Sequence, residues 1–307
     1  MAADPVLTVV VTVVSDTAEQ SDTCHLEGCL EALQHQIDPP PMEVLVTCDS
    51  QLPGIQELER RFPHVCFICV DTLRTVRSGH TREHHDKLRG IGIQRARAPL
   101  VALIEDHSRP DVHWSAALIK EHAQSRAAIG GAIENGIDRA LNWAVYFSDF
   151  GRYQNPVRRG PSTYLSDANV CYKRAALEQV AEAWSGGYDE ARVHAALTRR
   201  GETLALSPDV IVYQHRLGLR LATALVERYV WGRSFGAGRT ALIAPWQRAL
   251  YAVLCPLLPP ILFLRQLRNV LRTGRNRAAF LRAAPLTALL DVAWSCGECV
   301  GYLTGHP

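Results

Sequence analysis

Three consecutive ionisable residues, Glu105, Asp106 and His107, follow an apolar run from Leu100 to Ile104. The run is short and rich in branched side chains, which predicts a strand buried on both faces of a parallel sheet. Ligands of open α/β sheets bind outside the carboxyl ends of the strands, where buried ionisable groups are costly unless they bind something. Adjacent carboxylates and an imidazole there favour a divalent-metal site. The alternative is a polar loop that caps the next helix, with Asp111 as its N-cap.

Strand and helix patterns alternate over the first part of the chain and predict the fold class. Apolar runs predict strands at 6–14, 42–47 and 65–70, and helical stripes lie between them at 24–36 and 55–61. This alternation predicts an α/β protein with a right-handed, mostly parallel sheet flanked by helices. Further strands are expected at 127–133, 169–172 and 204–213, whereas residues 136–168 look irregular.

The charge of the chain divides it into two regions. The net charge is +2, which favours no special partner and gives no reason to expect nucleic-acid binding. From Arg216 onward, twelve arginines against Glu227, Asp291 and Glu298 give +9, which leaves −7 for the first 215 residues. We therefore expect two domains, 1–215 and 216–307, with different neighbours.

The basic tail carries two apolar stretches, 249–264 and 283–305, on either side of an arginine-rich segment. A spanning helix needs about 20 apolar residues, but the first stretch is short and contains prolines, and the second contains acids. A spanning hairpin would also place the arginines opposite a cytosolic domain, against the positive-inside tendency. We expect interfacial or re-entrant helices whose arginines face anionic headgroups. A soluble helical subdomain or an oligomer interface is the alternative.

Cysteine usage and the N-terminus indicate where the protein works. Nine scattered cysteines do not form a disulfide framework, which indicates reduced thiols in a cytosolic compartment. The N-terminus has no basic n-region and no cleavage site, so its apolar run predicts a first strand and not a signal peptide. The expected location is the cytoplasmic face of a membrane, as a peripheral or monotopic protein.

Over residues 6–216, the order of these features resembles family 2 glycosyltransferases with the GT-A, Rossmann-like fold. KLRGIGIQRARAPLVALIEDHSRPDVHW resembles the segment in which an arginine and a glycine precede a strand and a DXD-type acidic motif. EVLVTCDS resembles the strand that ends in a nucleotide-contacting aspartate, and SDANVCYKR is similar to an acceptor-side segment. GGYDEARVHAALTRRGETL resembles the region that supplies the catalytic base. The tail resembles those of bacterial members that work at membranes.

The resemblance implies a metal-dependent transfer of a sugar from a nucleotide-sugar donor to a hydroxyl acceptor, with lipid-linked acceptors among the candidates. Mn²⁺ or Mg²⁺ would be held by Asp106, Glu105, His107 and His215. The donor would be contacted by Ser15, Asp16, Asp49, Arg89 and Asn169. An inverting transfer needs a base near the acceptor hydroxyl. Glu190 is the first candidate for this base and Asp189 is the second. The alternative is that neither is catalytic and that both carboxylates are present because the N-terminus of a helix stabilises negative charge.

Some features depart from the family pattern and keep other functions open. The acidic motif is Glu-Asp-His and not Asp-x-Asp, and Cys48 replaces a usual acid. These changes are compatible with a catalytically degenerate GT-A-fold membrane scaffold. No QxxRW motif is present, which argues against a processive enzyme. A nucleotidyltransferase would normally have a glycine-rich, basic phosphate loop after the first strand, but that turn here reads SDTAEQSD.

Overall fold

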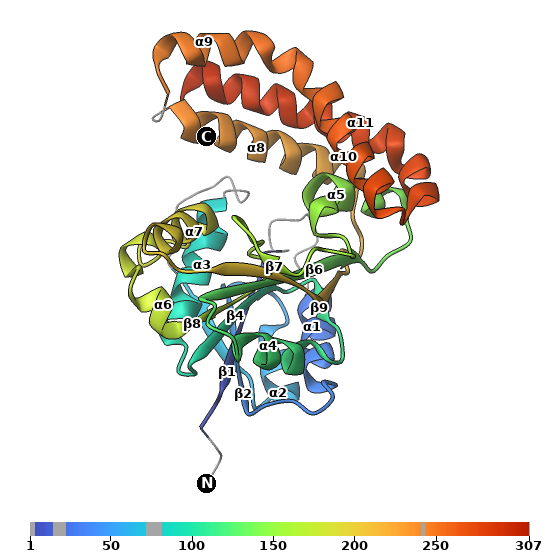
Figure 1. Cartoon of the computed structure of the whole chain (residues 1–307). Coiled ribbons are helices and arrows are strands. Elements are labelled where there is room, and N and C mark those ends of the chain that lie inside the picture. Colours follow the sequence, from blue (N-terminus) through green and yellow to red (C-terminus); the bar gives the residue numbers. More distant parts are fainter. Residues whose placement is uncertain (1–3, 15–22, 72–81, 241–242, 307) are drawn as a thin grey trace. The chain divides into compact units, whose positions relative to one another are not determined.

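The computed structural model of the chain describes residues 4–14, 23–71, 82–240 and 243–306 (Figure 1). The chain forms two compact units, of which unit 1 comprises residues 1–134 and 155–215. Unit 2 comprises residues 135–154 and 216–307. Residues 135–154, predicted to belong to the first domain, lie in the same unit as the C-terminal helices.

Unit 1 is built on a mixed sheet of nine strands within the described residues, in the order β3-β2-β1-β4-β8-β6-β9-β5, with β7 beside β9. The strands are β1 Leu7–Thr12, β2 Met42–Asp49, β3 Cys66–Val70, β4 Leu100–Glu105, β5 Ser108–Pro110, β6 Ala128–Asn135, β7 Gly160–Pro161, β8 Asn169–Lys173 and β9 Leu204–Gln214. The first four strands in this order are parallel, and β8 runs antiparallel to β4. The predicted α/β class is therefore confirmed, with the addition that the second half of the sheet is antiparallel.

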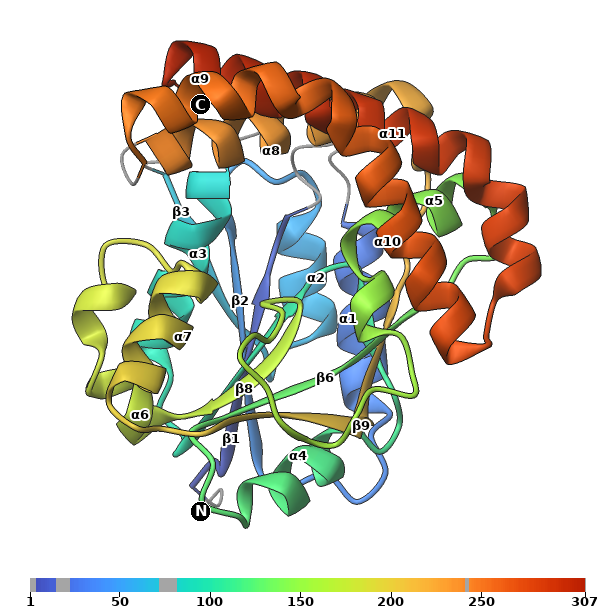
Figure 2. The ribbon, with the colours of Figure 1, turned by 45° about the horizontal axis from the view of Figure 1, so that its top comes forward.

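Helices flank both faces of this sheet (Figures 1 and 2). They are α1 Cys24–Gln34, α2 Ile55–Arg61, α3 Arg82–Arg95, α4 Trp114–His122, α6 Arg174–Glu178, η4 Ala181–Ala183 and α7 Glu190–Arg199. On one face, Val10, Leu103 and Tyr172 share a buried core with Leu177 of α6 and Leu197 of α7. Every residue of β1 is buried, as its continuous run of branched side chains predicts for a central parallel strand.

Residues 136–168, expected to be irregular, contain a helix. α5 Ala140–Asp149 is followed by the short η3 Gly151–Tyr153, and both belong to unit 2. The rings of Trp143 and Phe147 stack at 5.4 Å, and Phe147 meets Phe280 edge-on at 5.1 Å. The aromatic residues of this segment recur at helical spacing, and their burial against the C-terminal helix explains why the segment is ordered.

Unit 2 is otherwise helical. Its remaining elements are α8 Leu221–Thr240, α9 Pro245–Leu254, η5 Cys255–Leu257, α10 Leu258–Thr273 and α11 Arg277–Thr304. Glycines let α8 and α11 approach closely. A Cβ at Gly232 of α8 would lie 2.2 Å from the carbonyl oxygen of Trp294, and one at Gly297 of α11 would lie 1.9 Å from that of Tyr229. Small residues four apart on each helix are typical of closely packed helix pairs in membranes.

This close approach predicts that Gly232→Ala destabilises unit 2. The added methyl group meets backbone that cannot rotate away, and overpacking of this kind costs about 1–3 kcal/mol. Gly238→Ala in the same helix is the control, since no heavy atom lies within 4 Å of a Cβ there and alanine favours the helix by up to about 1 kcal/mol. Urea unfolding followed by circular dichroism measures both. Equal stability of the two variants would contradict the close packing of α8 on α11.

Candidate functional site

The acidic motif lies where β4 ends and the chain turns into β5. Glu105 is the last residue of β4, and its register partner in β1 is Thr12. β9 pairs antiparallel with β5, so it ends where β5 begins, and the main-chain N–H of His215 donates to the carbonyl oxygen of His107 at 2.8 Å. The fold thus brings His215 beside the motif, as the sequence analysis expected, although the two are far apart in the chain.

The carboxylate of Asp106 joins the ends of two strands. Asp106 is 1% exposed, and its Oδ1 accepts a hydrogen bond of 3.0 Å from the N–H of Val14. Its own N–H donates to the carbonyl oxygen of Thr12 at 3.0 Å. Asp106 therefore stabilises the junction of β1 and β4 in addition to any role in binding.

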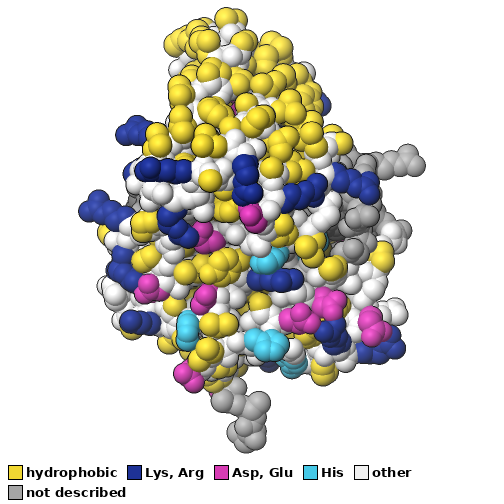
Figure 3. All heavy atoms as spheres, turned by 90° about the vertical axis from the view of Figure 1, so that its right-hand side faces the viewer, with side chains coloured by type: hydrophobic (Ala, Val, Ile, Leu, Met, Phe, Trp, Pro, Cys, Tyr) yellow, Lys and Arg dark blue, Asp and Glu magenta, His cyan; other side chains and the backbone are white. Residues whose placement is uncertain are grey.

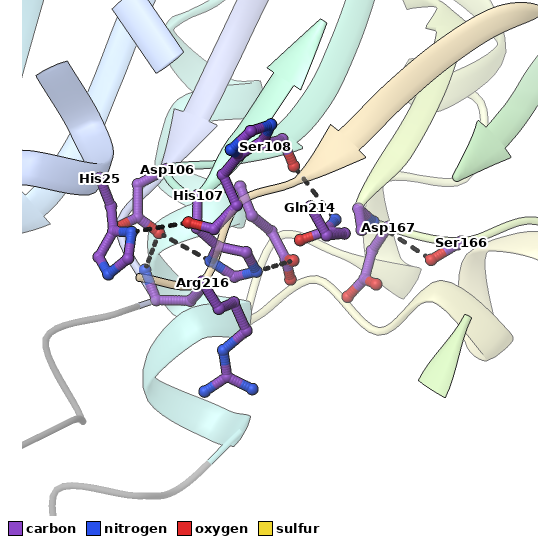
Figure 4. A network of polar contacts seen from close by, with 12 residues as sticks. His25, Asp106, His107, Ser108, Ser166, Asp167, Gln214 and Arg216 are labelled. Atoms are coloured by element: carbon purple, nitrogen blue, oxygen red, sulfur yellow. Dashed lines mark hydrogen bonds and ion pairs between the residues drawn. The ribbon is translucent and has the colours of Figure 1, made fainter. Parts of the chain in front are cut away.

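His107 lies between the two carboxylates of the motif (Figure 4). Its Nε2 is 3.3 Å from Oε2 of Glu105, and its Nδ1 is 3.5 Å from Oδ1 of Asp106. Burial favours the neutral imidazole, but the hydrogen bonds and charges of Asp106 and Glu105 outweigh it and raise the pKa of His107 to about 9. In His215 burial dominates, and the nearby cations add to it, so that its pKa falls to about 4.

Arg89 of α3 is the buried cation of the site. Its side chain is 4% exposed, and one terminal nitrogen lies 2.9 Å from Glu105 and 3.2 Å from Asp167. The other terminal nitrogen lies 3.6 Å from Asp86. Burial alone would lower the pKa of Arg89, but the charges of Asp167, Glu105 and Asp86 outweigh it and raise that pKa. Arg89 therefore carries its charge among three carboxylates.

The two candidate bases at the start of α7 have different surroundings. Asp189 is the N-cap of α7, and its Oδ1 accepts from the N–H groups of Ala191 and Arg192 at 2.9 and 3.1 Å. Glu190 instead accepts from the N–H of Asp167 at 2.9 Å, which links it to the residue that faces Arg89. The helix-start explanation accounts for Asp189, whereas Glu190 belongs to the network of Arg89.

Asn169 begins β8, and its side chain is bound to other parts of the fold. It is fully buried, and its Nδ2 donates to the carbonyl oxygens of Ala132 and Val210 at 2.9 and 3.0 Å. Its Oδ1 accepts from the indole N–H of Trp114 at 3.0 Å. These bonds hold the amide between two strands and α4, although the residue itself is paired with Ile104 of β4, directly before the acidic motif.

Of the remaining residues predicted to contact the donor, Asp49 is among the described residues, whereas Ser15 and Asp16 are not. Asp49 is the last residue of β2 and is partly exposed, and its Oδ1 accepts from the N–H of Gln51 at 2.8 Å, which closes the following turn. It lies at the carboxyl edge of the sheet, as expected for a ligand of this fold. Ser15 and Asp16 lie outside the described residues.

Several residues of the site were not predicted. Asp86 and Asp167 both pair with Arg89. Asp167 lies in the segment SDANVCYKR, but it was not predicted to be a site residue. The Nδ1 of His25 in α1 donates to the carbonyl oxygen of His215 at 3.0 Å, and its ring lies 6.4 Å from that of His107. The spacing of Asp86 three residues before Arg89 on one helix could have indicated their contact. The contacts of Asp167 and His25 join segments far apart in the sequence, so no local pattern indicates them.

The candidate metal ligands form an incomplete site by themselves. Among the described residues, no group of three or more His, Cys, Asp or Glu side chains is arranged to hold an ion. Carboxylate oxygen and imidazole nitrogen nevertheless suit Mn²⁺. Mg²⁺ is usually held by one or two carboxylates together with substrate phosphates. Glu105 and Asp106 therefore fit an ion shared with a phosphorylated substrate, and not an ion held by protein alone.

The position of His107 predicts a pH dependence of stability. A pKa raised above the unfolded value of about 6.5 means that the folded protein holds the proton more tightly. The resulting stabilisation is complete below about pH 6.5 and is lost as the pH rises through about 9. In metal-free buffer, we expect His107→Gln to lower the free energy of unfolding by roughly 3 kcal/mol more at pH 6 than at pH 10.

Urea unfolding at both pH values tests this expectation. His113→Gln, at an exposed histidine, is the control for the substitution itself. If His107→Gln costs the same at pH 6 and pH 10, His107 is not an imidazolium held by the two carboxylates.

Comparisons with known proteins identify the fold. No protein-family model matches the chain, and no curated protein matches it in sequence. The structure of the mannosyltransferase PcManGT from Pyrobaculum calidifontis, in complex with GDP-Man and Mn²⁺, matches with a TM-score of 0.54 at 18% identity. The match covers 99% of this chain and 88% of that one. S. aureus TarS 1–349 in complex with UDP-GlcNAc matches at 0.49 and 11% identity, over 72% of this chain and 65% of that one.

Proposed function

We propose that this protein transfers a sugar from a nucleotide-sugar donor to a hydroxyl acceptor. The observation that carries the proposal is the cluster of Glu105, Asp106, His107, Arg89 and His215 at the carboxyl edge of the sheet, in a fold shared with a mannosyltransferase structure that contains GDP-Man and Mn²⁺. A glycosyltransferase of the family 2 type, inverting and non-processive, is the form of the proposal that the sequence motifs favour.

The proposed reaction is a displacement at the anomeric carbon of the donor sugar. The bond from this carbon to the diphosphate oxygen breaks, and the nucleoside diphosphate leaves with the electron pair. The acceptor oxygen forms the new bond from the opposite face, and its proton passes to a carboxylate. We assign that carboxylate to Glu190, because the N–H of Asp167 links it to the network of Arg89 and the acidic motif, whereas Asp189 accepts two N–H groups as the N-cap of α7. A base must have an oxygen within hydrogen-bond reach of the acceptor hydroxyl.

A divalent ion, Mn²⁺ or Mg²⁺, belongs to the proposal. Asp106 and Glu105 would hold it with the donor diphosphate, and His107 and His215 are the remaining candidate ligands. When bound, such an ion neutralises charge that develops on the leaving diphosphate. Arg89 contributes a fixed positive charge beside Glu105. The cytoplasmic membrane face as the location and a lipid-linked acceptor stay predictions.

Titration calorimetry of GDP-mannose and other nucleotide sugars, with Mn²⁺ or with EDTA, tests donor binding. We expect Mn²⁺ alone to bind weakly and the donor to bind at least tenfold more tightly with Mn²⁺. Asp106→Asn should remove this gain, because it keeps an oxygen for the N–H of Val14 but loses the charge. Asp209→Asn, at an exposed carboxylate, is the control and should keep the gain.

The outcomes separate this proposal from its rivals. A catalytically degenerate scaffold would bind no donor under any condition. If the donor bound as tightly in EDTA as with Mn²⁺, donor binding would not depend on a metal ion. Product analysis separates the two enzyme classes, because a glycosyltransferase releases a nucleoside diphosphate and a nucleotidyltransferase releases pyrophosphate.

Glu190→Gln should keep donor binding and lose transfer. The change removes basicity with little change of shape, and loss of a general base typically costs 10²–10⁴-fold in rate. Asp189→Asn is the matched control, since asparagine caps helices as well as aspartate does and should leave turnover within a few-fold. Steady-state release of the nucleoside diphosphate measures both variants. If the two results are exchanged, the base is Asp189.

A further inference from the structure

The C-terminal helices expose an unusual apolar face. Along α9, η5 and the first half of α10, six large apolar side chains are 44–75% exposed: Trp246, Leu250, Val253, Leu257, Ile261 and Leu264. We call these six residues the apolar stripe. Their spacing of three or four residues places them on one side of the helical segment. In a helix that packs on a soluble protein, this pattern points inward, whereas here it points outward.

α11 repeats the pattern. Leu281, Leu289, Val292 and Leu303 are 42–71% exposed and also share one side of their helix. Figure 3 shows hydrophobic side chains gathered over the region of the C-terminal helices, bordered by Lys and Arg side chains. Contiguous apolar surface of this extent with a polar rim marks a site of interaction with a protein or a membrane.

The charges around this surface favour a negatively charged partner. Beyond residue 215 the chain has no lysine and only three acids. All three are buried and accept hydrogen bonds inside unit 2: Glu227 from Arg216, Asp291 from Gln266, and Glu298 from Trp294. In contrast, six arginines that follow the apolar stripe are exposed: Arg265, Arg268, Arg272, Arg275, Arg277 and Arg282. Of these, Arg282 pairs with Asp138 of the same unit. The tail therefore presents apolar and positively charged side chains together, and its negative charges face inward.

A second copy of the chain fits this surface poorly. A symmetric dimer buries the same patch of both subunits, and this patch offers arginines with no exposed acid of the tail to pair with them.

An arrangement in which these helices span a membrane fits the structure poorly as well. α9–α10 and α11 are long and apolar enough to cross a membrane, but α10 and α11 carry buried polar side chains, Gln266, Asp291 and Glu298, that bond within unit 2. The inner side of α11 carries Asp291 and Glu298 and packs against α8.

We propose that unit 2 docks on an anionic lipid bilayer by inserting the apolar stripe into one leaflet, with the arginines of α10 at the level of the headgroup phosphates. Apolar side chains supply the insertion free energy, and arginines near the surface add an attraction that salt weakens. This surface is separate from the residues assigned to sugar transfer, so either proposal can fail while the other holds.

Flotation of the full chain with vesicles tests the proposal. We expect binding to vesicles of phosphatidylcholine with one third phosphatidylglycerol, and much weaker binding to phosphatidylcholine alone. Val253→Asp with Leu257→Asp should abolish binding at any salt concentration. The matched control is Ile37→Asp with Val112→Asp, which adds the same charges at exposed apolar positions of unit 1 and should bind as the wild type does.

The arginine contribution is tested separately. Each arginine near the surface contributes about fivefold to vesicle affinity, so Arg268→Ala with Arg272→Ala should weaken binding roughly twenty- to thirtyfold at low salt. The loss of affinity should be smaller at high salt, which screens the attraction. Arg199→Ala with Arg200→Ala, in unit 1, is the charge-matched control. Quenching of tryptophan fluorescence by brominated lipid should be lost in Trp246→Phe, because Trp246 is the single tryptophan of the apolar stripe and would lie among the acyl chains.

Three results would overturn the proposal. The first is a full chain that ignores both kinds of vesicle. The second is unchanged binding of the Val253→Asp, Leu257→Asp variant. The third is a dimer in sedimentation experiments that this variant turns into a monomer, which would make the face an interface between copies of the chain.

Discussion

The candidate site depends on one buried cation. Arg89 lies at 4% exposure within 3.6 Å of three carboxylates, which come from α3 itself, from the end of β4 and from the segment before β8. Removing one member of such a buried group leaves an uncompensated charge, which typically costs 3–5 kcal/mol. The same guanidinium reaches Asp167, whose N–H holds Glu190. One side chain thus fixes the separation between the acidic motif and the candidate base.

The reversal of strand direction completes this arrangement. A purely parallel sheet would bring only strand ends such as those of β1, β2 and β4 to the carboxyl edge. Because β9 runs antiparallel to β5, its own end arrives beside the acidic motif and delivers His215. His25 then binds the carbonyl oxygen of His215 from α1. Side chains from α1, α3 and the end of β9 therefore meet the acids of the motif at one edge of the sheet.

The sequence allowed the parallel half of the sheet and the acidic motif to be predicted, because buried strands and their polar ends are local patterns. It did not reveal the helix at 140–149, whose aromatic side chains are ordered by Phe280 of α11, far away in the chain. Asn169 illustrates the same limit. Its position in a motif suggested a ligand, but whether its amide faces a ligand or two neighbouring strands depends on the sheet order. Two partners of Arg89, Glu105 and Asp167, come from segments far from α3, so spacing could not join them to Arg89.

The discontinuity of unit 2 has a consequence for the synthesis of the chain. α5 leaves the ribosome early, but α11, on which it packs, follows more than a hundred residues later. At usual rates of translation, Trp143 and Phe147 therefore wait on the order of ten seconds before their partner exists. During that interval the nascent chain carries an uncovered aromatic helix, which is a natural target for chaperones and a source of misfolding if elongation stalls. The synthesis of α11 ends this exposure.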